Sequence, residues 1–84
     1  MTTKIQIIKL KNKLLHDLMK YAHDDVVFLS NELDISYQTV YQWKRIGISD
    51  RALRMIIGTK LVSLVPEELK NYINTKYSNK DKLL

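Results

Sequence analysis

The chain has 84 residues, of which 45% are hydrophobic and 27% are charged, and it contains no cysteine. This length suits one small globular domain over residues 1–84, and the lack of cysteine excludes disulfides and thiolate metal sites. Lys and Arg outnumber Asp and Glu by 14 to 9, which gives a net charge of +5 and favours polyanionic partners.

The first predicted element is a helix over about Lys11 to Ala22. Apolar residues recur there at helical spacing, at Leu14, Leu15, Leu18 and Met19. The stretch KIQIIKLK before it has partly alternating apolar residues, so it suits either a short strand or a helix.

A second helix follows, capped by Asp24 or Asp25, because a carboxylate there accepts the unpaired N–H groups of the first turn. The segment DIS interrupts the apolar pattern, and we expect Asp34 to take the left-handed conformation there. Ser36 then caps a third helix to about Arg45, with Val40 and Trp43 facing inward.

Ser49 is predicted to cap a fourth helix to about Lys60, with Leu53, Ile56 and Ile57 inward and Gly58 weakening its end. Pro66 suits the first position of a fifth helix, PEELKNYINTKY, and the tail after Ser78 is expected to fray. The chain is therefore predicted to be an all-α domain of four to five helices.

The second and third helices are short and are joined by a tight turn, which is the form of a helix-turn-helix over about residues 25–45. Ser30 is small enough to let the two helices approach, and Val40 and Trp43 anchor the second of them. The residues left outward or sideways are Tyr37, Gln38, Thr39, Tyr41 and Gln42.

From Val26 to Ile57 the chain resembles the Cro-like and repressor-type helix-turn-helix proteins of temperate bacteriophages, most specifically in VYQWKR followed by a capped helix. That family binds operator DNA as dimers, with the second helix in the major groove. The resemblance implies DNA contacts by Ser36, Tyr37, Gln38, Thr39 and Gln42. One departure is Asp34, which stands where the turn usually holds Gly and places a carboxylate near phosphates.

The resemblance also implies a sequence-specific transcriptional regulator in the bacterial cytoplasm, at the nucleoid. A repressor of a palindromic operator is the simplest form, and a phage-type activator is the near variant. A protein-interaction module that uses exposed tyrosines as interface anchors is the alternative from another class.

The side-chain chemistry favours DNA independently. A Gln amide matches N6 and N7 of adenine with one donor and one acceptor, and Thr or Tyr can reach a phosphate or a thymine methyl. Tyr41 is expected either to contact DNA or to pack on the preceding helix. Four basic residues are predicted to neutralise phosphates beside the recognition helix: Lys44, Arg45, Arg51 and Arg54.

The sequence gives little support for catalysis, metal binding or membrane insertion. His16 and His23 have no convincing third ligand, no nucleophile has a partner base, and no apolar run approaches the ~20 residues of a membrane span. We therefore expect no enzyme activity, no cofactor, no metal and no small-molecule substrate.

A homodimer is expected, because one helix reads too few base pairs to select a site. Its interface is assigned to KIQIIKLK or, preferably, to the C-terminal segment that includes a helix over about residues 66–77. The apolar residues of the latter segment are Leu61, Val62, Leu64, Val65, Leu69, Tyr72 and Ile73. Alternatively, Leu69, Tyr72 and Ile73 cover the monomer's own core.

Overall fold

A computed structural model of the chain describes residues 3–82, with side chains described over residues 3–77. The helices follow one another without a strand in this part of the chain, so the all-α prediction is confirmed. In chain order they are α1 (Lys4–Tyr21), α2 (Val26–Leu33), α3 (Tyr37–Ile46), α4 (Asp50–Ile57), the 3-10 helix η1 (Lys60–Leu64) and α5 (Glu67–Lys82).

Helix α1 begins at Lys4, so the helix is the correct one of the two structures considered for KIQIIKLK, and the predicted helix start near Lys11 was wrong. The cause is a capping box: the N–H of Gln6 donates to Oγ1 of Thr3, and the N–H of Thr3 donates to Oε1 of Gln6. These two bonds satisfy N–H groups that a helix start leaves unpaired. Ile7 is then buried in helical phase with Leu14.

Two neighbouring aspartates in the turn between α1 and α2 have different structural roles. Asp24 adopts a left-handed conformation, with φ at 63°, whereas Asp25 caps α2 by accepting a hydrogen bond from the N–H of Phe28 at 3.1 Å. Of the two candidates, Asp25 is therefore the cap.

A three-residue turn joins α2 to α3. Asp34 has φ 56° and ψ 48°, the predicted left-handed conformation. Its N–H donates to the carbonyl of Asn31, and the N–H of Ile35 donates to the carbonyl of Ser30 at 2.9 Å. This pair of bonds is the Schellman pattern that closes a helix end, and Ser36 caps α3 as predicted.

The C-terminal half departs from prediction at two boundaries. Helix α4 ends at Ile57 rather than near Lys60, because Thr59 caps the separate helix η1 through a bond from the N–H of Leu61. Helix α5 continues to Lys82, beyond the point where fraying was predicted. The end of that tail, residues 83–84, lies outside the described residues.

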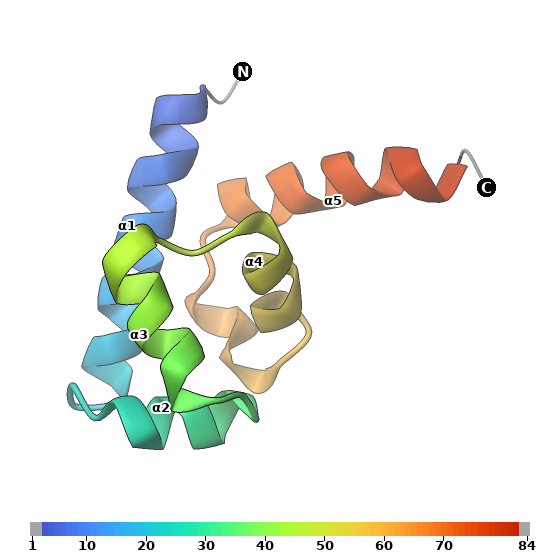
Figure 1. Cartoon of the computed structure of the whole chain (residues 1–84). Coiled ribbons are helices and arrows are strands. Elements are labelled where there is room, and N and C mark those ends of the chain that lie inside the picture. Colours follow the sequence, from blue (N-terminus) through green and yellow to red (C-terminus); the bar gives the residue numbers. More distant parts are fainter. Residues whose placement is uncertain (1–2, 83–84) are drawn as a thin grey trace.

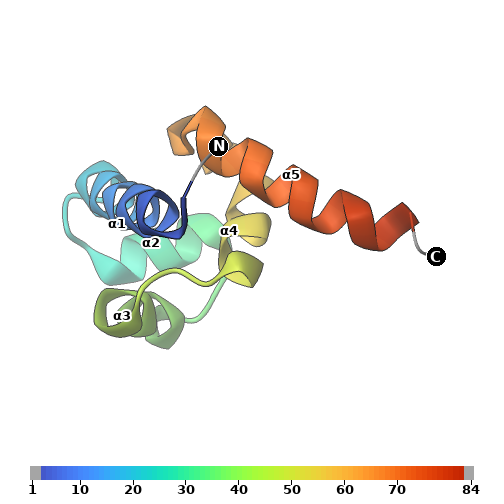
Figure 2. The ribbon, with the colours of Figure 1, turned by 90° about the horizontal axis from the view of Figure 1, so that it is seen from above.

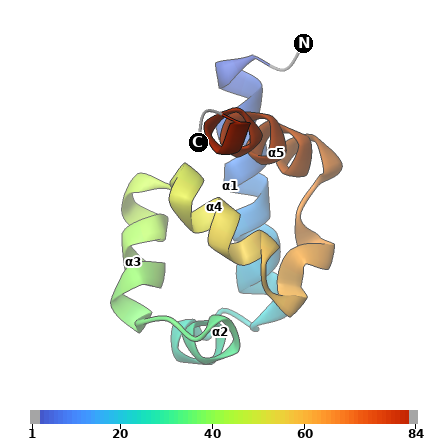
Figure 3. The ribbon, with the colours of Figure 1, turned by 90° about the vertical axis from the view of Figure 1, so that its right-hand side faces the viewer.

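The five α-helices enclose one core. Helix α2 crosses below α1 and α3, α4 lies to the right of these two helices, and α5 passes above α4 and projects beyond the rest (Figures 1 and 2). Seen from the right, α4 lies in front of α1, and α3 lies to the left of both (Figure 3). The core includes the fully buried Leu14, Leu18, Leu29, Val40, Leu53, Ile56 and Leu69.

The C-terminal apolar residues serve this core. Leu69 and Ile73 are only 0% and 3% exposed, and the hydroxyl of Tyr72 donates to Oδ2 of Asp50 at 2.9 Å. They therefore cover the monomer, as in the alternative considered from the sequence, and α5 does not offer these side chains to a second copy.

Two carboxylates tie distant helices together around the core. Nζ of Lys11 in α1 donates to Asp50 at 2.6 Å, and Lys76 in α5 pairs with the same side chain. Partial burial alone would raise the pKa of Asp50, but the hydrogen bonds from Lys11, Lys76 and Tyr72 outweigh it and lower that pKa to about 2. Hydrogen bonds from Lys60 and Tyr21 likewise lower the pKa of Glu32, joining α2 to η1 and α1.

Candidate nucleic-acid interface

Helix α3 is fixed to the domain along one side. Val40 is fully buried and Trp43 is 4% exposed, so Trp43 is a core residue as predicted. The buried Ser30 of α2 donates its hydroxyl proton to the carbonyl of Val27 at 2.8 Å, which leaves no unpaired polar group at the contact between the two helices. A helix held in this way presents its opposite side in a defined orientation.

Four side chains form the outer ridge of α3, spaced by three, four and seven residues so that they share a helix face. They line one shallow surface depression and are Gln38, Tyr41, Gln42 and Arg45. Within the described part of the chain, Gln38, Gln42 and Arg45 make no side-chain hydrogen bond or ion pair. Their donors and acceptors are therefore free for an external ligand.

An aromatic pair borders this ridge. The rings of Tyr37 and Tyr41 lie edge to face, with centroids 6.1 Å apart, and the two residues are 51% and 55% exposed. Of the two roles considered for Tyr41, the structure favours an exposed one, since its ring packs on Tyr37 of the same helix.

The first turn of α3 carries the two hydroxyl residues of the predicted site. Ser36 is exposed, and its Oγ accepts from the N–H of Gln38 at 3.2 Å. Because a hydroxyl both accepts and donates, this cap keeps one proton for a phosphate. Thr39 is half-buried, so it has less surface to offer than its neighbours.

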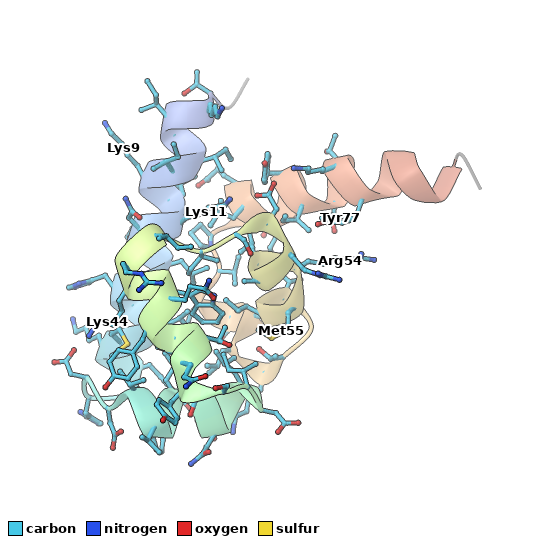
Figure 4. The ribbon with its side chains drawn as sticks, viewed as in Figure 1. Lys9, Lys11, Lys44, Arg54, Met55 and Tyr77 are labelled. Atoms are coloured by element: carbon cyan, nitrogen blue, oxygen red, sulfur yellow. The ribbon has the colours of Figure 1, made fainter. Side chains whose placement is uncertain are left out.

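The four predicted basic residues do not form one cluster. Lys44 faces α1 and borders a depression with Leu15, His16 and Met19. Arg54 lies instead over the ring of Tyr77 in α5, with Cζ 4.3 Å from the ring centroid. Figure 4 shows Lys44 and Arg54 on opposite sides of the molecule.

The other two basic residues lie on different helices. Arg45 belongs to the outer ridge of α3, and Arg51 is exposed near the start of α4. The prediction of one basic cluster relied on the proximity of these four residues in the sequence. In the folded chain they lie on different surfaces.

Acidic residues are concentrated around α2. Residues 21–34 contain no Lys or Arg, and their carboxylates are Asp24, Asp25, Glu32 and Asp34. The positive charges of the chain therefore lie on the other elements: α1 carries five Lys residues, whereas α3 and α4 carry two basic residues each.

One exposed apolar patch was missed by sequence reasoning. Tyr21 and Phe28 lie with ring centroids 6.2 Å apart, and Val27 beside them is 56% exposed. Helical spacing could have predicted this patch, because positions 27 and 28 of α2 face away from the buried Val26 and Leu29.

No group of three His, Asp or Glu side chains that could hold a metal ion occurs in the described residues. Among the same residues, no helix has the length and apolar character needed to cross a membrane.

Comparison of the chain with models of protein families, with curated proteins and with solved structures found no match.

Proposed function

We propose that the protein is a sequence-specific binder of double-stranded DNA and acts as a transcriptional regulator. The observation that carries this proposal is the outer ridge: two glutamines and an arginine, exposed and without intramolecular polar partners in the described residues, on a helix anchored by Val40 and Trp43. A buried apolar side is common to surface helices, so the support comes from the three long polar side chains on the outer side, which are available to contact a ligand.

The dimensions of α3 suit the major groove. Ten residues make a helix of about 15 Å, and the groove, about 12 Å wide, admits one α-helix. With the ridge toward the base edges, the amides of Gln38 and Gln42 would meet adenines, and Tyr41 would lie close enough for a thymine methyl.

The hydroxyls and cations around α3 would position the duplex. Ser36 and Tyr37 lie at its first turn, where backbone N–H groups and the helix dipole also favour a phosphate. Lys44 at the side of α3 that borders α1 and the exposed Arg51 of α4 would add positive charge. Arg54 contributes less, because its guanidinium already stacks on Tyr77.

A homodimer on a palindromic operator completes the proposal, since two copies double the number of base pairs read. With Leu69 and Ile73 in the core, the N-terminal half of α1 becomes the better interface. It carries Ile5 and Ile8, which are 66% and 51% exposed. Occupation of the operator would exclude polymerase, which makes a repressor the simplest regulator, with activation as the variant.

The test is a selection of bound fragments from random duplexes with the full chain, followed by titrations over a range of salt concentrations. We expect one enriched motif with two-fold symmetry and an affinity that falls steeply with salt, because phosphate contacts release counterions. A failure to enrich any motif, together with salt-independent binding, would refute the proposal.

The second candidate is a protein-interaction module, favoured by the exposed Tyr37–Tyr41 pair and the patch of Tyr21, Val27 and Phe28. Aromatic residues are enriched in protein interfaces. Binding through such surfaces would respond little to salt, so the same titration separates the two functions.

A further inference from the structure

Arg45 differs from the other basic residues in where its helix places it. It follows Gln38 by seven residues and Gln42 by three, and all three side chains line the same depression. Its neighbour Lys44 is turned about 100° away around the helix and borders the depression beside α1. Lys44 therefore lies at the side of α3 that borders α1, whereas Arg45 lies on the outer ridge of α3.

The guanidinium is also free to turn outward. Arg45 is exposed and, among the described residues, has no carboxylate or aromatic partner. Arg54, by comparison, is held over Tyr77. Arg45 would therefore break no intramolecular contact on meeting a ligand.

We infer that Arg45 reads a guanine base rather than a phosphate, an inference that rests on the proposed DNA-binding function. The planar guanidinium presents two parallel N–H donors that match O6 and N7 of guanine, while a Gln amide matches adenine. A ridge of Gln38, Gln42 and Arg45 thus selects adenines followed by a G·C pair within each half-site.

The helix geometry gives the spacing. Seven residues at 1.5 Å each place Arg45 about 10 Å along the axis from Gln38. Base pairs follow one another at about 3.4 Å along the duplex axis, so an α3 axis aligned with the duplex places the guanine at most about three base pairs from the adenine that Gln38 reads. The end of α3 nearer Gly47 therefore points toward the G·C pair.

The test compares two neighbouring substitutions that remove the same charge, Arg45→Gln and the matched control Lys44→Gln, in the full chain. Both residues are exposed, and circular dichroism with thermal unfolding checks that both variants fold. Selection from random duplexes is run on the unmodified protein and on each variant. Affinities for the site selected by the unmodified protein are then measured.

We expect the unmodified protein to select guanine at one position of each half-site and Arg45→Gln to select adenine there. The Arg45→Gln variant should bind the original site about 5- to 150-fold more weakly. The Lys44→Gln variant should keep the guanine preference and lose affinity similarly on cognate and random duplexes.

If Arg45→Gln retains the guanine preference, Arg45 does not read that base and the inference is overturned, while DNA binding stands. If the unmodified protein selects no sequence at all, the proposed function fails first and the inference fails with it. The selection on the unmodified protein therefore distinguishes a failure of the proposed function from a failure of the inference about Arg45.

Discussion

The carboxylate of Asp50, near the start of α4, accepts a hydrogen bond from Nζ of Lys11 in α1 at 2.6 Å. Tyr72 and Lys76 of α5 bind its other oxygen. One partly buried side chain thus joins three helices, and these helices support the domain behind α3. The sequence indicated helix capping by Ser49 but gave no sign that the next residue would hold α1 and α5.

Asp50→Asn should lower the free energy of unfolding by about 2 kcal/mol at neutral pH, the value that corresponds to a pKa displaced from 3.8 to about 2. Because the folded pKa is lowered, this stability is present above pH 4 and is lost as the pH falls toward 2. Urea unfolding at pH 7 and pH 2.5 measures it. Glu67→Gln is the control, since Glu67 is exposed, and an equal loss in both variants would contradict the assignment.

Gln38→Ala should weaken binding to the selected site by about 1 to 3 kcal/mol and relax the base preference at one position of each half-site. The reason is that an alanine there leaves the adenine edge without its donor and acceptor. Competition titrations with cognate and random duplexes give the two affinities. Equal losses on both would show that Gln38 does not read a base.

Lys44 and Arg54 should behave differently although both are exposed cations. Lys44→Ala should reduce the slope of log affinity against log salt by about one, as expected for a phosphate contact. Arg54→Ala should change that slope less but should lower stability by about 0.5 to 1 kcal/mol through loss of its stack on Tyr77. Identical salt slopes for the two variants would speak against the separation seen in Figure 4.

Asp34→Asn should strengthen binding to all duplexes, and more so at low salt. Asn tolerates the left-handed conformation of this turn, where φ is 56°, so the substitution removes the negative charge while keeping the backbone. Asp24→Asn is the matched control in the turn before α2. Equal gains at the two positions would indicate a general effect of net charge instead of proximity to phosphates.

Local signals predicted the helix-turn-helix well because each depends on neighbouring residues. Asp34 closes α2, Ser36 caps α3, and Val40 and Trp43 mark the buried side. The capping box of Thr3 and Gln6 was equally local, yet the partly alternating apolar residues after it suited a strand as well as a helix. Recognising the box would have placed the start of α1 correctly.

Features that join distant parts of the chain could not be predicted in the same way. The stack of Arg54 on Tyr77 requires α5 to fold back over α4. The burial of Leu69 and Ile73 depends on how much surface α1 and α4 leave uncovered. A residue pattern gives the apolar face of α5 but not whether this chain or a second copy covers it.

The proposed dimer gives the last prediction. Ile8→Ser should shift the chain toward monomers in sedimentation experiments without changing the unfolding free energy of the monomer, because Ile8 is 51% exposed and adds little to the core. Val27→Ser is the matched control, being a β-branched residue that is 56% exposed on α2. Truncation of the chain at Val65 would not test the dimer interface, because it removes Leu69 and Ile73 from the core. The truncated chain should therefore fail to unfold cooperatively. If Ile8→Ser remains dimeric while Val27→Ser dissociates, the interface lies at α2, whereas an unmodified chain that stays monomeric on a palindromic duplex refutes the dimer itself.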